Sequence, residues 1–202
     1  MAGAKVRITA GFSLSVKQDE LARVLAQVTA DAKHLPKAAD RAARRVFEWL
    51  RNQVARELGR QLGIPQAALK TRLTVRRYDG NPPAWVLFLG SEPMPVDKMG
   101  KVSQNRVGVA ARGGTTKGGF ISNVYADGRK AWIRKRRARA LGLDLYGIDK
   151  GETFNNGRFP VMRISRDIHK AAAPIFKQYS QQAERRFYER LGHELAQLSG
   201  KR

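Results

Sequence analysis

The densest group of chemically active side chains is a basic segment near the middle of the second half of the sequence. Seven of the eleven residues from Arg129 to Arg139 are basic and none is acidic; they are Arg129, Lys130, Arg134, Lys135, Arg136, Arg137 and Arg139. Arginine and lysine neutralise phosphates and release counterions, so the segment predicts sequence-independent contact with nucleic acid.

Two other interpretations of this basic segment stay open at the level of sequence. It also fits a solvated basic face or a docking site for an acidic protein. Trp132 lies among the basic residues, where it either stacks on a base or anchors the segment in a core.

A glycine-rich stretch, Gly113–Gly119, precedes the basic segment and invites comparison with a phosphate-binding loop. The pattern G-x-x-x-x-G-K-[ST] requires Lys after Gly118, and Gly119 stands there instead. We therefore expect a flexible loop. Lys117 within it and the neighbouring Arg112 are weaker candidates for contact with phosphate or a partner.

The sequence offers little support for catalysis, a metal or another cofactor. The three histidines, His34, His169 and His193, have no metal-ligand spacing, and no G-x-S-x-G word is present. The acids of the segment 144–152 (Asp144, Asp149 and Glu152) leave a metal-dependent nuclease as a minor alternative. We expect a protein that is not an enzyme and that holds no cofactor.

Composition narrows the class of protein further. The chain has 202 residues, 42% of them hydrophobic, and 39 Lys plus Arg against 17 Asp plus Glu, for a formal net charge of +22. A compact body with this surplus of charge repels itself unless an anion is near, and nucleic acid is the usual partner. The absence of cysteine excludes disulfides and thiolate metal sites. We expect no secretory signal in residues 1–10 and no membrane span.

Hydrophobic periodicity predicts the elements that position these side chains. Alternation predicts a strand over 6–16, and helical spacing follows over 21–28. The clearest helix runs from Ala39 to Leu62, with six arginines mostly off its apolar stripe, and stops at Gly63-Ile64-Pro65. A short helix, Gln66–Lys70, comes next. The arginines off the stripe are Arg41, Arg44, Arg45, Arg51, Arg56 and Arg60.

The second half of the sequence predicts strands, loops and one more long helix. Runs 73–78 and 84–90 predict a hairpin whose second strand is central or covered on both faces. Residues 91–163 form a loop-rich basic region with short strands, expected at 102–110, 120–125 and 159–164. A helical stripe runs from Ile168 to Leu198 and contains Pro174, and residues 199–202 are expected to fray. The predicted fold is a single α+β domain over 1–202, with a small, mostly antiparallel sheet, two long helices and long Gly-rich loops.

The order of these elements and several short words resemble a known family, the phage minor tail protein Z family of tail completion proteins. The resemblance covers about residues 36–180 and is carried by Ala38-Ala39-Asp40-Arg41-Ala42-Ala43-Arg44, Leu62-Gly63-Ile64-Pro65-Gln66-Ala67-Ala68-Leu69-Lys70-Thr71-Arg72-Leu73, Met94-Pro95-Val96, Gly119-Phe120-Ile121 and Gly157-Arg158-Phe159-Pro160-Val161.

The resemblance implies a structural role without enzymatic activity. It implies a virion protein, made in the host cytoplasm, that closes a homo-oligomeric ring, expected to be a hexamer, at the head-proximal end (the neck) of a phage tail. Its implied partners are the tail terminator, the head-completion or connector proteins and the genomic DNA end, with no membrane. The alternative from composition is a stand-alone, sequence-nonspecific nucleic-acid-binding protein.

Overall fold

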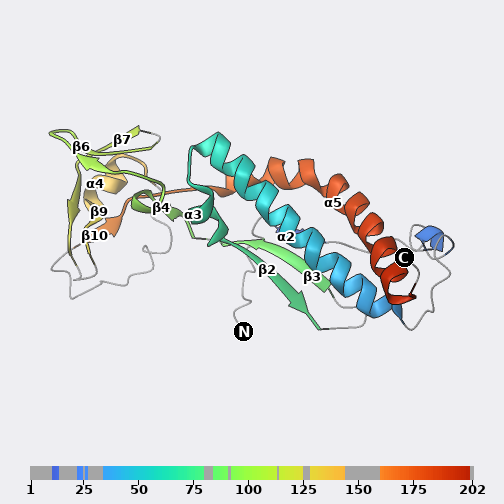
Figure 1. Cartoon of the computed structure of the whole chain (residues 1–202). Helices are drawn as coiled ribbons and strands as arrows, with labels where there is room; N and C mark the ends of the chain where they lie inside the picture. The colour runs from blue at the N-terminus through green and yellow to red at the C-terminus, as the bar shows by residue number, and fades with distance from the viewer. Residues whose placement is uncertain are drawn as a thin grey trace, which may run out of the picture. The chain divides into compact units, whose positions relative to one another are not determined.

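The computed structural model describes residues 11–13, 22–24, 26, 34–79, 84–90, 92–112, 114–124, 128–143 and 160–200 (Figure 1). The expected α+β fold is confirmed: two long helices accompany small antiparallel sheets. Where the sequence suggested one domain, the chain is organised as two compact units. The first comprises Met1–Leu58, Leu69–Gly90 and His169–Arg202, and the second Gly59–Ala68 and Ser91–Ile168.

The longest element early in the chain is helix α2, Leu35–Leu62, which confirms the expected helix and its stop. Pro36 lies in its first turn, where a missing N–H costs nothing. Gly63 has φ +64°, and the Ile64 N–H bonds the Gly59 carbonyl at 3.1 Å, which is the 6→1 bond of a Schellman stop. The apolar stripe of α2 is buried, including Phe47, Leu50, Val54 and Leu58.

The second long helix, α5 (His169–Leu198), runs antiparallel beside α2 (Figure 1). Trp49 of α2 meets Tyr179 with ring centroids 6.1 Å apart, whereas Arg45, one turn earlier, meets Glu194 further along α5. Pro174 lies inside α5. Its buried face holds Ala172, Ile175, Phe176, Ala183, Phe187, Leu191 and Leu195.

A three-stranded sheet with order β1-β3-β2 completes the first unit. Strands β2 (Leu73–Tyr78) and β3 (Ala84–Leu89) form the predicted antiparallel hairpin, in register from Leu73↔Leu89 to Tyr78↔Ala84, and β1 (Gly11–Ser13) pairs with β3 on its other edge. β3 is therefore central, as expected. It is not covered on both faces, because Leu87 and Leu89 are buried while Phe88 is 37% exposed.

Side-chain contacts attach this sheet and the short helix α3 (Gln66–Lys70) to α2. The Phe47 ring lies 6.2 Å from the Trp85 ring of β3. Arg77 of β2 donates from Nε to Asp40 at 2.6 Å, and this carboxylate raises the pKa of Arg77, first through the hydrogen bond and then through its charge. Arg51 donates from Nη2 to the Lys70 carbonyl at 2.9 Å, which anchors the end of α3.

The described residues of the second unit include eight short strands in three small sheets. Their orders are β5-β6-β7, β10-β9-β8 and β11-β4. The strands are β4 (Met94–Pro95), β5 (Ser103–Gln104), β6 (Gly108–Ala111), β7 (Gly114–Lys117), β8 (Gly119–Ser122), β9 (Lys130–Arg134), β10 (Val161–Arg163) and β11 (Ser165–Arg166). A 3₁₀ turn η2, Val96–Lys98, follows β4, and helix α4, Lys135–Ala140, follows β9.

Two sequence expectations in the second unit are wrong. The strand expected at 102–110 is a pair of strands, because the Asn105 side chain accepts the N–H groups of Val107 and Gly108, each at 2.9 Å, and turns the chain. The flexible loop expected at Gly113–Gly119 contains β7, where Thr115 and Thr116 pair with Ala110 and Val109. These β-branched residues favour an extended chain despite the flanking glycines.

The other short strands expected there occur with shifted bounds, as β8 and β10. Strands β4, β9 and β11 were not expected. At the C-terminal end, Ser199 and Gly200 form a turn in which the Ser199 N–H bonds the Leu195 carbonyl at 3.0 Å.

Several expectations fall on residues outside the described part. They concern most of the strand over 6–16, much of the helix over 21–28, the acids Asp144, Asp149 and Glu152, and residues 201–202. Residues 22–24 and 26 are helical. Among the described helices, none has an apolar stretch of the length needed to cross a membrane.

Candidate nucleic-acid interface

Strand β9 is the platform on which the basic segment is built. It is the central strand of its sheet, and its three inner residues, Ala131, Trp132 and Ile133, are all buried. The Trp132 indole N–H donates to the Ser122 carbonyl of β8 at 3.0 Å. Trp132 is only 5% exposed, so of its two possible roles the structure supports the core anchor and not a platform for a base.

Helix α4 follows β9 without a connecting loop and carries most of the charge. Arg134 is extended, with φ −67° and ψ 133°, and the chain turns helical at Lys135. The helix ends in a Schellman motif: Gly142, with φ +62°, donates to the Arg139 carbonyl at 3.0 Å, and Leu143 donates to the Ala138 carbonyl at 3.0 Å. Six residues are too few to be helical alone, so these contacts hold the helix in place.

The charged side chains of this region point outward. Ala138 is the one buried residue of α4; Arg134, Arg136, Arg137 and Arg139 are exposed, and Lys135 is half-buried. We call Arg134, Lys135, Arg136, Arg137 and Arg139 the α4 cluster. Like charges three and four positions apart repel one another on a helix. Cations at a helix N-terminus are also opposed by the helix dipole. An anion bound at the cluster relieves both costs.

The β7–β8 turn lies against the cluster at Arg137. A Cβ placed on Gly118 would lie 3.1 Å from Arg137 Cγ and 3.2 Å from Arg137 Nε, so the Arg137 side chain lies directly against this turn. The turn follows Lys117, which is exposed. Two residues that the sequence singled out separately, Lys117 and Arg137, therefore flank one glycine.

The other predicted site residues lie at different places. Arg129 is exposed in the chain before β9, and Lys130 is half-buried within it. Arg112 lies against Gly63, where an added Cβ would be 2.9 Å from Arg112 Nε. Arg112 thus contacts the end of α2, and this contact gives it a structural role.

The sequence did not mark Arg163, or the arginines that line a groove of the first unit, as residues of a site. Arg163 of β10 makes an ion pair with Asp97, with Nη2 at 2.7 and 2.6 Å from the two carboxylate oxygens, and so has a structural role. In the first unit, arginines of α2 and α5 line one groove. No local pattern marks that groove, because its two halves are far apart in the sequence.

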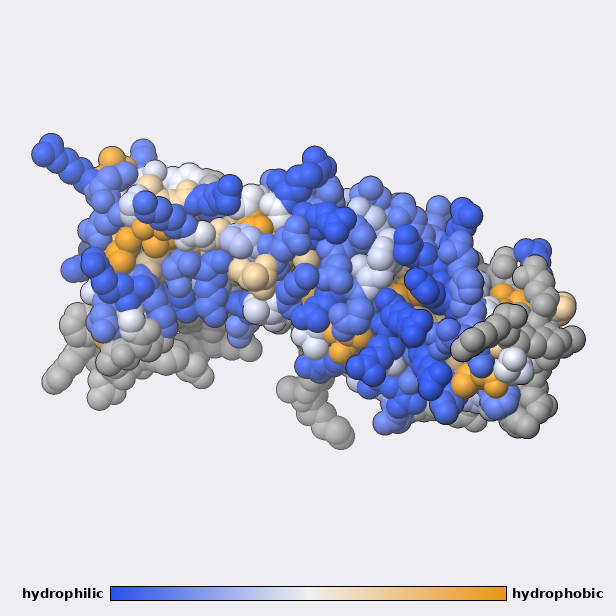
Figure 2. All heavy atoms as spheres, viewed as in Figure 1, coloured by the Kyte–Doolittle hydropathy of each residue, from blue (hydrophilic) through white to orange (hydrophobic). Residues whose placement is uncertain are grey.

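The chemistry available at the α4 cluster is electrostatic binding. Among the described residues, no group of three or more His, Asp or Glu side chains is placed to hold a metal ion. His34 precedes α2, and His169 and His193 lie on α5. The face seen in Figure 2 is mostly hydrophilic, with hydrophobic residues in small separate patches.

Comparison of the chain with protein-family models, with curated proteins and with solved structures finds no match. The resemblance to the minor tail protein Z family therefore stays a prediction from the short words and the order of elements.

Proposed function

We propose that this protein is a non-enzymatic structural component of a phage particle. In this proposal it completes the head-proximal end of the tail as a ring and contacts the DNA end through the α4 cluster. The observation that carries the proposal is the set of outward-pointing cations on α4, with the turn at Gly118 against Arg137 and no acid in the helix.

The geometry of the α4 cluster suits phosphate contact without base recognition. Its cations belong to the end of strand β9 and to the short capped helix α4, so their backbone positions are fixed before binding. Trp132, the aromatic residue of the segment, is committed to the core. Phosphate contacts of this kind position a protein on nucleic acid and carry no direct sequence information.

Assembly into a ring would raise the affinity of such a cluster for DNA. One subunit offers a handful of phosphate contacts, which bind weakly at physiological salt. Several copies held around one duplex act together, and the later contacts become intramolecular. The order of elements supports the tail assignment, since a long helix, a Gly-Ile-Pro stop, a short helix, a hairpin and a C-terminal long helix follow one another as the resemblance requires.

The test of the assignment is to purify the phage particles encoded beside this gene and to quantify the chain by mass spectrometry. We expect about one ring of subunits per particle. Absence from particles, with abundant protein in the infected cell, would reject the tail assignment. It would favour the alternative, a stand-alone nucleic-acid-binding protein. The excess of basic residues, 39 against 17 acidic ones, supports that alternative.

The α4 cluster itself is tested by the double variant Arg136→Gln/Arg137→Gln. Both side chains are exposed, so the fold should persist. Duplex DNA affinity should fall, and the slope of log affinity against log salt should shrink by about 2, near 0.9 for each lost phosphate contact. The measurement is fluorescence anisotropy with a labelled duplex over a series of salt concentrations.

The matched control is Lys170→Gln/Lys177→Gln, which removes the same charge from exposed positions of α5. Its salt slope should stay close to that of the unchanged protein. Equal losses in the two double variants would mean that DNA responds to net charge alone, and the assignment of the α4 cluster would be wrong.

A further inference from the structure

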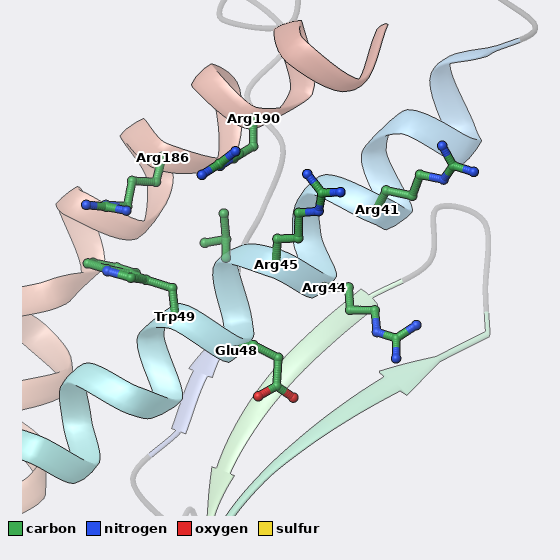
Figure 3. A pocket seen from close by; sticks show the side chains of 8 residues that line it. Arg41, Arg44, Arg45, Glu48, Trp49, Arg186 and Arg190 are labelled. Atoms are coloured by element: carbon green, nitrogen blue, oxygen red, sulfur yellow. The ribbon is translucent and has the colours of Figure 1, made fainter. Parts of the chain in front are cut away.

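The two long helices of the first unit enclose a groove lined by arginine (Figure 3). Its volume is about 710 Å³. We call it the arginine groove and define it by five arginines and one aromatic residue, namely Arg41, Arg44, Arg45, Arg186, Arg190 and Trp49. Figure 3 shows the side chains of Arg186 and Arg190 reaching from α5 toward α2, above Trp49.

Contacts within the chain hold several of these groups in position. The Arg186 guanidinium lies over the Trp49 ring, 4.3 Å from its centroid. The Tyr179 ring meets Trp49 edge-on, at an interplanar angle of 80°. A guanidinium stacked on an aromatic face loses little further freedom when it binds, because its plane is already oriented.

A buried carboxylate already pairs with the arginines at one end of the groove. Glu194 of α5 is 1% exposed, and its oxygens lie 2.8 Å from Arg45 Nη1 and 3.7 Å from Arg41 Nη1. Neither oxygen has a hydrogen bond of good geometry, so the attraction is coulombic. Two of the arginines thus pair with a carboxylate, whereas Arg186 and Arg190 have no carboxylate of this chain within ion-pair distance among the described residues.

We propose that the arginine groove binds an acidic peptide segment of a partner protein. Carboxylates of that segment pair with Arg186 and Arg190. The planar fork of arginine matches a carboxylate with two parallel hydrogen bonds, and all cations lining the groove are arginines. Arginine clusters are also a recurring means of recognising acidic motifs in peptides.

Nucleic acid fits this groove less well than a peptide. The groove is recessed between two helices, whereas the phosphates of a duplex lie on a convex surface. A single strand would need a free aromatic face for its bases. Trp49 has one face covered by Arg186 and an edge contact with Tyr179.

The test uses the full chain and a fluorescein-labelled peptide of ten glutamates as the probe, at physiological salt. Arg186→Gln/Arg190→Gln should weaken peptide binding about tenfold, the scale of two partly exposed ion pairs. Lys170→Gln/Lys177→Gln, with the same charge removed from the same helix, should weaken it less than about twofold. Duplex DNA affinity should change equally little in the two variants.

Trp49 supplies a second, local measurement. Saturating peptide should change the tryptophan emission of the protein by disturbing the Arg186–Trp49 contact, and the change should vanish in Trp49→Phe. Unchanged peptide affinity in Arg186→Gln/Arg190→Gln, or equal weakening in the lysine variant, would overturn the proposal. Stronger loss of duplex DNA than of peptide would instead assign the groove to nucleic acid and also overturn it. None of these outcomes depends on the α4 cluster, so the proposal stands or falls separately from the tail assignment.

Discussion

At the scale of single residues, Gly118 has the most direct influence on the proposed DNA contact. It has φ +75°, and a Cβ at this position would be in tight contact with the Arg137 side chain, 3.1 Å from its Cγ. Its N–H also donates to the Val107 carbonyl at 2.8 Å, which ties the β7–β8 turn to the β5–β6 turn. One glycine therefore sets the turn and the position of a cation of the α4 cluster.

Gly118→Ala should lower both the stability and the DNA affinity of the protein. An L residue at this φ costs about 1 kcal/mol, and the new methyl group would press on the Arg137 side chain, whose Cγ lies 3.1 Å away. The measurements are urea unfolding and duplex anisotropy. Gly100→Ala is the control, because Gly100 has φ +139° but no atom within 4 Å of the new Cβ. The control should lose stability while retaining its DNA affinity. If Gly118→Ala also retained its DNA affinity, the position of Arg137 would not matter for binding.

At the scale of elements, α3 shows how a very short helix is held in place. A helix of five residues is far below the length that is stable alone in water. Its buried residue, Leu69, is 0% exposed, and its last carbonyl accepts the hydrogen bond from Arg51 of α2. Packing and one charged donor therefore stabilise α3, more than its own helical propensity does.

Arg51→Ala should destabilise the first unit by about 1 kcal/mol, since it removes a charge-assisted hydrogen bond from a carbonyl at a helix end. Hydrogen exchange should speed up at α3 and Arg72 more than in the middle of α2. Arg56→Ala is the control, because Arg56 is exposed and donates a hydrogen bond to Gln53, one turn away on the same helix. A similar loss of stability in the two variants would argue against the anchoring role of Arg51.

The elements predicted well from sequence are those with strong local signals. The Gly63-Ile64-Pro65 stop, α3 and the β2–β3 hairpin depend on neighbouring residues, so the sequence alone is sufficient. β9 was missed because its buried residues Ala131, Trp132 and Ile133 follow one another without polar residues between them. β7 was missed because its Thr115-Thr116 pair is flanked by glycines and shows no alternation of polar and apolar residues. The α4 cluster was visible as a run of charge. The arginine groove was not, because only tertiary packing brings Arg45 and Arg186 to the same place.

At the scale of the whole molecule, charge is the dominant physical feature. A formal charge of +22 on 202 residues opposes any compact state. Individual ion pairs such as Arg77–Asp40 and Arg163–Asp97 offset only a small part of it. Anionic partners at the α4 cluster and the arginine groove would offset more, so binding and stability should be linked.

The melting temperature should rise when sodium chloride increases from about 10 to about 150 mM, because the screening length shortens from about 30 to about 8 Å. Sodium sulfate at equal ionic strength should raise it further, since a divalent anion also binds at arginine clusters. Circular dichroism during heating measures both. A melting temperature that falls with salt would mean that the ion pairs outweigh the repulsion.

All the cations among the described residues that line the groove are arginines, and this has a practical consequence for mapping its contacts. Amine-reactive labels and lysine cross-linkers modify ammonium groups, and the described residues that line the groove include no lysine. A footprint made with such reagents would leave this surface blank even when a partner occupies it. Dicarbonyl reagents, which condense with guanidinium groups, would report occupancy there as protection of Arg186 and Arg190.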